Sequence, residues 1–184
     1  MMKPQNDPIL VDPILIVPGL RNSGPGHWQT WFEHTQPRTR RVQQQDWEHP
    51  HLPDWAGRVR DALEAEPAPV WVVAHSFGCL ASVAAACQAP GKILGALLVA
   101  PADPDRFQIP AVVLEEQLPF PSLVVASSND PWVSLDSARR WARTWGSDFI
   151  NVGPLGHINV DSGHGPWPEV LQHFSRLQQS LELA

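Results

Sequence analysis

The chain has few cysteines for its 184 residues, and the two it has lie close together. Cys79 and Cys87 fall two turns apart in one expected helix, too far from each other along its axis to form a disulfide. A chain that needs no disulfide suits a reducing compartment. We therefore expect a cytoplasmic protein.

Basic residues are also in short supply. The chain has 13 Lys and Arg against 19 Asp and Glu, a formal net charge of −6. The basic residues are scattered apart from residues 38–41, which we expect to form a solvated edge. Binding to nucleic acid or to an anionic membrane requires a basic face. We therefore expect no nucleic-acid and no membrane partner, whereas a small molecule is possible.

Long apolar runs are missing as well. No stretch approaches the ~20 apolar residues of a membrane span, and the amino-terminal residues lack the basic start and apolar run of a signal peptide. We expect residues 1–10 to be a flexible N-terminus. The length fits one domain, residues 1–184, with a sizeable core.

Short apolar runs alternate with amphipathic stretches along the chain. The runs predict strands at residues 14–17, 70–75, 93–100, 122–127 and 148–152, with a weaker strand at 42–45. Helices are expected at residues 27–34, 54–66 (capped by Asp54), 79–89, 134–145 and 167–183. This order predicts a compact α/β fold, a mostly parallel sheet with helices on both faces. Ligands of such sheets bind beyond the carboxyl ends of the strands.

A serine follows one of these strands directly. Ser76 lies between Ala74 and Gly78, a variant of the G-x-S-x-G elbow in which Ala replaces the first glycine. Such an elbow presents the hydroxyl above the sheet, beside the free N–H groups of a helix N-terminus. The motif is short, and a serine capping the helix of an ordinary βα unit would also fit it.

An acid and a base follow in loops after later strands. Asp130 comes after the strand at residues 122–127, and His157 after the last strand. The order Ser, Asp, His is that of α/β-hydrolases, so we predict a catalytic triad of these residues. Asp103 is an alternative acid, but its flanking prolines favour a turn. His164 is an alternative base, but no strand immediately precedes it.

Other site residues can be proposed from their place in the chain. The backbone N–H groups of Phe77 and Leu20 are the expected oxyanion donors, with Asn22 and Ser23 as alternatives to Leu20. Trp28 and Trp132 fall in expected active-face loops and are candidate substrate-binding residues, although tryptophans in a small domain often fill the core.

Three further sets of side chains receive structural interpretations. His75 is expected to point to the opposite side of the elbow and to be a packed or loop-supporting residue. Cys79 is expected to be a small core residue. Histidines and carboxylates are frequent before the elbow, but their spacing matches no zinc motif: His27, His34, Asp46, Glu48, His49 and His51. We therefore expect no metal and no cofactor.

Seven short segments and one glycine together resemble the small serine hydrolases of the retinoblastoma-binding-protein/YdeN type. They are VPG at 17–19 with SGPGHWQ at 23–29, QDW at 45–47, AHSFG at 74–78, SNDP at 128–131, and GHIN at 156–159 with Gly163 and WP at 167–168. The resemblance covers nearly the whole chain. It implies an α/β-hydrolase fold with nucleophile, acid and base at the three positions chosen above, and leaves the substrate open.

The sequence thus predicts a serine hydrolase that cleaves a small ester, thioester or amide through an acyl-enzyme, with water as second substrate. Residues 101–121, where lipid hydrolases commonly insert a cap, have room for about one short helix, so no cap domain is expected. The alternative is a binding or regulatory protein that keeps the fold with little turnover.

Overall fold

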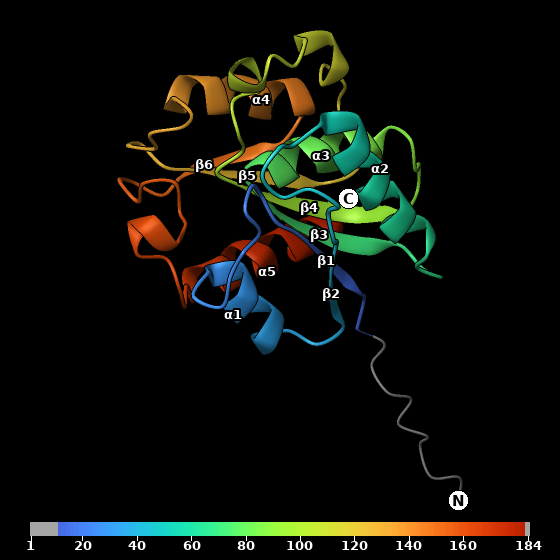
Figure 1. Ribbon diagram of the computed structural model, residues 1–184. Coiled ribbons are helices and arrows are strands. Elements are labelled where there is room, and N and C mark those ends of the chain that lie inside the picture. Colours follow the sequence, from blue (N-terminus) through green and yellow to red (C-terminus); the bar gives the residue numbers. More distant parts are fainter. Residues whose placement is uncertain (1–10, 183–184) are drawn as a thin grey trace, which may run out of the picture.

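A computed structural model describes residues 11–182, so the expected flexible N-terminus at residues 1–10 lies outside the described residues. Six strands form one sheet in the order β2-β1-β3-β4-β5-β6, with every neighbouring pair parallel (Figure 1). The strands are β1 (Ile14–Val17), β2 (Thr39–Arg41), β3 (Val70–His75), β4 (Ile93–Val99), β5 (Ser122–Ala126) and β6 (Asp148–Asn151).

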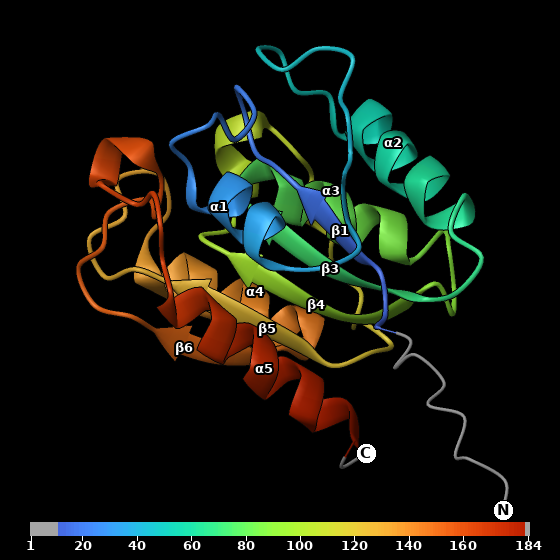
Figure 2. The same ribbon diagram turned by 90° about the horizontal axis from the view of Figure 1, so that it is seen from below.

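Helices cover both faces of the sheet, as Figures 1 and 2 show. One face packs against α2 (Leu52–Glu64), α3 (Phe77–Ala86) and α4 (Leu135–Trp145), and the other against α1 (Trp28–Thr35) and α5 (Glu169–Glu182). Every residue of β1, β3 and β5 is buried, which explains why these strands are apolar except for His75 at the end of β3 and Ser122 at the start of β5. The α/β architecture expected from the sequence is confirmed.

The second strand lies three residues earlier than expected. The weak apolar signal at 42–45 predicted a strand there, but β2 is Thr39–Arg41. This edge strand pairs with β1 alone, so it can carry polar and charged side chains. Val42, the apolar residue behind the prediction, is buried just beyond the strand.

The helix expected at residues 54–66 also begins earlier, at Leu52. His51 is the residue before its first turn, and Pro53 fits that turn because proline has no N–H to leave unpaired. Asp54 is therefore not the cap. Its carboxylate lies 2.9 Å from Nδ1 of His51 on the exposed surface instead.

The segment after β4 contains no cap domain. It forms two short 3₁₀ helices, η1 (Pro104–Phe107) and η2 (Ala111–Val113), where the sequence predicted irregular or partly helical structure. The carboxyl ends of the strands therefore open onto loops. Within residues 11–182, no helix combines the length and apolar character needed to span a membrane.

Candidate active site

The turn between β3 and α3 holds Ser76 in a backbone conformation that is rare for a side-chain-bearing residue. Its φ is 54° and its ψ −124°, and its N–H donates to the carbonyl of Val99 at 3.1 Å. The turn needs Gly78, because a Cβ there would lie 2.3 Å from the carbonyl oxygen of Val17. The buried Ala74 is small enough to replace the first glycine of the motif. The sequence therefore forms the sharp elbow that exposes the serine hydroxyl.

The three residues predicted as a triad form one continuous chain of hydrogen bonds. His157 Nε2 lies 2.9 Å from Ser76 Oγ, and His157 Nδ1 lies 2.8 Å from Asp130 Oδ2. The Asp130 side chain is fully buried, and its other oxygen accepts from the N–H of Trp132 at 2.8 Å. An ionised carboxylate can only accept, so Nδ1 carries the proton and Nε2 is free to accept the serine proton.

Residues 127–134, between β5 and α4, form the acid loop, and residues 152–159, between β6 and η3, form the base loop. Two side chains that were not predicted as site residues join these two loops. Asn129 Oδ1 accepts from the N–H of Gly156 at 2.7 Å and from the hydroxyl of Ser127 at 2.9 Å. Ser127 Oγ in turn accepts from the N–H of Leu155 at 2.9 Å. These bonds hold the residues next to Asp130 against the residues next to His157. The sequence signals for Asn129 were its place beside the predicted acid and in the SNDP segment at 128–131, and neither shows which groups its side chain reaches.

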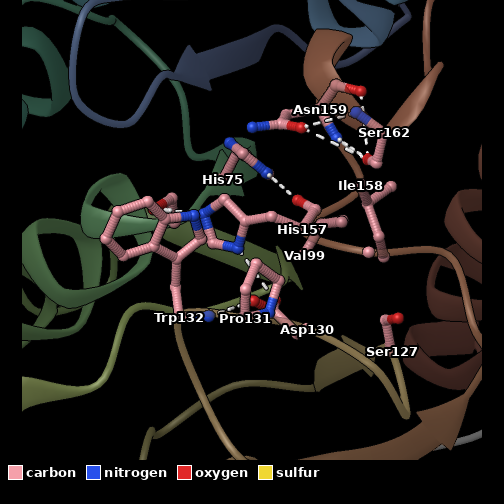
Figure 3. A network of polar contacts seen from close by, with 12 residues as sticks. His75, Val99, Ser127, Asp130, Pro131, Trp132, His157, Ile158, Asn159 and Ser162 are labelled. Carbon is pink, nitrogen blue, oxygen red and sulfur yellow. Dashed lines mark hydrogen bonds and ion pairs between the residues drawn. The ribbon is translucent and has the colours of Figure 1, made fainter.

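His75 supports the base rather than pointing away from it. Its Nε2 donates to the backbone carbonyl of His157 at 2.9 Å, as Figure 3 shows, and the two ring centroids are 5.0 Å apart. Burial, followed by the nearby His157 and His27, lowers the pKa of His75 well below its usual value. His75 is therefore a neutral donor beneath the loop of His157, which agrees with the expected loop-supporting role but not with the expected direction.

His27 is a second neutral imidazole at this place. It caps α1, with Nδ1 accepting from the N–H of Gln29 at 3.1 Å, and its ring packs edge-on against His75 at 4.9 Å. Burial, then the charge of Arg41, lowers the pKa of His27 to about 4. Among residues 11–182, no three His, Cys, Asp or Glu side chains are grouped so that they could hold a metal ion.

The loop after β1 lies directly against the nucleophile. A Cβ at Gly19 would be 2.7 Å from Ser76 Cβ and 3.3 Å from Ser76 Oγ, so only glycine fits. Leu20 follows it, and Phe77 begins α3 on the other side of Ser76. In the described part of the chain, neither of their backbone N–H groups has a hydrogen-bond acceptor. Both are thus free to donate to a ligand.

The alternative oxyanion donors already have partners. The N–H of Asn22 donates to the carbonyl of Gly19, and the N–H of Ser23 to the Asn22 side chain at 2.7 Å. Arg41 holds this loop by donating to Asn22 Oδ1 at 3.0 Å and to the Ser23 carbonyl, and it pairs with Glu33. Arg41 is therefore a mostly buried anchor and not part of a solvated edge.

Ser76 lines a cleft of about 390 Å³ that is bounded by loops from five parts of the chain. Its lining includes Leu20, Asn22, His27, His75, Asp103, Arg106, Phe107, Trp132, His157 and Val160. Trp132 is 54% exposed, and Figure 3 shows its indole beside the His157 ring. The structure thus places Trp132 where it was predicted, in the wall of the cleft.

Trp28, the other candidate for substrate binding, does not line the cleft. Its side chain is 0% exposed and its indole N–H donates to the carbonyl of Ile158 at 2.9 Å. Trp28 also packs edge-on against Trp167 at 5.6 Å. It lies on the sheet-facing side of α1, so it is a core residue, and the predicted binding role is wrong.

The alternative acid and base lie apart from this hydrogen-bonded chain. Asp103 borders the cleft but caps η1, accepting from the N–H of Asp105 at 3.3 Å. His164 Nδ1 lies 3.3 Å from the hydroxyl of Ser162. Within residues 11–182, no hydrogen bond joins either of them to Ser76 or His157. The geometry therefore favours Asp130 over Asp103 as the acid, and His157 over His164 as the base.

The chain is similar to several known proteins. A family model described as serine hydrolase matches residues 14–176. A protein from Pectobacterium atrosepticum described as a YdeN-like hydrolase is 38% identical, with a TM-score of 0.86 over 92% of this chain and 91% of that one. No curated protein sequence matches the chain.

Two more distant structures share the fold. The ydeN gene product of B. subtilis is 19% identical, with a TM-score of 0.78 over 92% of this chain and all of that one. Est1E from Butyrivibrio proteoclasticus, solved with ferulic acid bound, is 14% identical, with a TM-score of 0.71 over 96% and 93% of the two chains. These two show the fold, whereas the family match and the 38% identical relative show that the chain is a YdeN-like member of the serine hydrolase family.

Proposed function

We propose that this protein is a carboxylesterase-like serine hydrolase that cleaves a small ester, thioester or amide through an acyl-enzyme. The observation that carries the proposal is the chain of hydrogen bonds from Asp130 through His157 to Ser76 at an open cleft. A serine hydroxyl is a weak nucleophile until a base takes its proton, and the base needs a carboxylate to fix its tautomer.

Acylation would begin with attack of Ser76 Oγ on the carbonyl carbon while His157 Nε2 takes the hydroxyl proton. Asp130 orients the imidazole and stabilises its charge. When the tetrahedral intermediate collapses, the bond to the leaving group breaks and His157 protonates that group. Water then attacks the acyl carbon while His157 takes a proton from it. The bond from that carbon to Ser76 Oγ breaks, His157 returns the proton to Oγ, and the acid leaves.

The developing oxyanion would be held by the free backbone N–H groups of Leu20 and Phe77. Each has a neighbouring glycine that helps to fix its position: Gly19, before Leu20, lies against Ser76, and Gly78, after Phe77, lets α3 approach the end of β1. Fixed donors of this kind stabilise the transition state without reorganising, and losing one costs about 10²- to 10³-fold in rate.

The small open cleft supports a small acyl substrate, and we propose no nucleic-acid or membrane partner. The two cysteines are free, with Cys79 buried, which supports the proposed cytoplasmic location. The alternative, a binding protein with little turnover, has no need for the hydrogen-bonded chain at Ser76.

Hydrolysis of p-nitrophenyl acetate tests the proposal. Ser76→Ala and His157→Gln should each lower kcat by ~10³- to 10⁴-fold or more, with folding preserved. Ser128→Ala is the matched control. This exposed serine belongs to the acid loop, but its side chain is outside the hydrogen-bonded chain. Activity that survives in Ser76→Ala would overturn the nucleophile, and a wild-type protein without turnover would favour the binding role.

A further inference from the structure

A second hollow lies beside the cleft, between the η1–η2 segment and the start of α2. Its volume is about 250 Å³, and eight of its ten lining residues are apolar or proline, so it suits an apolar occupant. The side chains that matter here are Leu52, Phe77, Phe107, Ile109 and Val113. We call this site the acyl hollow, for reasons that follow.

The acyl hollow adjoins the cleft at Phe107, which lines both. The Phe107 ring packs edge-on against that of Phe77, with centroids 4.8 Å apart. Phe77 is the residue directly after Ser76, and its backbone N–H is one of the proposed oxyanion donors. A group bonded to the carbonyl held at Ser76 would therefore have to pass Phe107 to reach the hollow.

The position of the base decides which half of the substrate lies there. His157 must protonate the leaving group, so the leaving group has to lie on the His157 side of Ser76. His157 and Trp132 line the cleft, with their ring centroids 6.4 Å apart, and neither lines the acyl hollow. The acyl group, on the opposite side of the carbonyl carbon, is the half that faces the hollow.

Val113 leaves apolar surface exposed in the wall of the hollow. This side chain is 49% exposed although it lines an apolar site, and covering it would remove apolar surface from water. We propose that the acyl hollow binds the aliphatic acyl chain of a medium-length ester or thioester, and that Val113 helps to set the preferred length. This inference rests on the proposed function, because it places the acyl chain relative to Ser76 and His157.

A series of p-nitrophenyl esters from acetyl to octanoyl, with one constant leaving group, tests the acyl hollow. Each methylene that enters the hollow should raise kcat/KM about fourfold, until the hollow is full. In Val113→Glu, a charge at the half-exposed wall should lower the ratio of hexanoyl to acetyl kcat/KM about tenfold. Val112→Glu is the matched control: it adds the same charge one residue away, at a side chain that is 73% exposed and does not line the hollow.

The outcomes separate the acyl hollow from the proposed function. If wild type hydrolyses the acetyl ester through Ser76 but gains nothing with acyl length, or if Val113→Glu and Val112→Glu behave alike, the acyl hollow is wrong and the hydrolase proposal stands. If no ester is hydrolysed, the proposed function is wrong, and the acyl hollow with it. A gain that follows the alcohol length in alkyl acetates, rather than the acyl length, would contradict the side assigned here.

Discussion

Asn129 joins the acid loop to the base loop by accepting from the N–H of Gly156, and it also accepts from the hydroxyl of Ser127, whose oxygen accepts from the N–H of Leu155. Asn129→Ala should lower kcat for p-nitrophenyl acetate by about 10- to 100-fold with little change in KM, because small displacements of the base are costly. Asn129→Asp keeps an oxygen acceptor and should recover part of the loss.

Asn151→Ala provides the control for that experiment. Asn151 also accepts from a backbone N–H of the base loop, that of Gly153 at 3.0 Å, but makes no bond to the acid loop. If Asn151→Ala lowers kcat as much as Asn129→Ala, or if Asn129→Asp recovers nothing, Asn129 has no specific positioning role.

The buried His27 makes stability depend on pH. Because the pKa of His27 is about 4 in the folded protein and 6.5 without burial, the unfolded chain binds a proton between these values and the folded chain does not. The stabilisation is therefore complete above pH 6.5 and is lost as the pH falls toward 4. His27→Asn keeps a capping side chain for α1 and removes the titration.

Urea unfolding of wild type and His27→Asn between pH 7 and 4.5 measures this effect. The free energy of unfolding of the wild type should fall more steeply with decreasing pH, by up to ~1.4 kcal/mol per unit. Parallel curves for the two proteins would show that the burial of His27 does not couple folding to protonation.

Residue identity and spacing predicted that Ser76, Asp130 and His157 would lie together, because each follows a recognisable strand and strand ends meet at one edge of a parallel sheet; the hydrogen bonds between them agree. Spacing could not separate Trp28 from Trp132. Both occupy short segments after strands, and only the packing of α1 against the sheet decides that Trp28 is buried. Nor could spacing show that the Asn129 side chain reaches across to Gly156.

At the scale of elements, the close approach of α3 to the end of β1 depends on Gly78. A Cβ there would lie 2.3 Å from the Val17 carbonyl and 2.5 Å from the Pro18 carbonyl, both of them backbone atoms. Gly78→Ala must push α3 away and should reduce the free energy of unfolding by about 1–3 kcal/mol or more.

Gly26→Ala is the comparison for this substitution, because a Cβ at Gly26 would meet nothing within 4 Å. Urea denaturation of the two variants measures the difference, and Gly26→Ala should stay close to wild type. Equal stability of the two variants would mean that α3 can move away from the end of β1 at no cost in free energy, which would contradict this account.

The buried strands were predictable because an unbroken apolar run is what a strand covered on both faces requires, as β1 and β3 illustrate. The edge strand β2 was misplaced by three residues, since its pairing with β1 depends on contacts between distant residues and not on its own apolar content. The start of α2 was misplaced because Asp54 looked like a cap, whereas Pro53 already belongs to the first turn.

For the whole molecule, the absence of a cap domain between β4 and β5 limits the substrates. The η1–η2 segment borders the cleft and the acyl hollow but has no helix long enough to form a lid. We expect kcat/KM to stop rising at medium acyl lengths and p-nitrophenyl palmitate to show no activation at a lipid–water interface. A steady rise to palmitoyl would require an apolar tunnel longer than the acyl hollow.

Covalent labelling with a fluorophosphonate, mapped by peptide mass spectrometry, tests the central claim that Ser76 is a nucleophile activated by His157. The probe reports attack directly and requires no knowledge of the substrate. We predict one adduct, on Ser76, that disappears in Ser76→Ala and forms far more slowly in His157→Gln. An adduct on another residue, or labelling of Ser76 that is equally fast without His157, would contradict the claim.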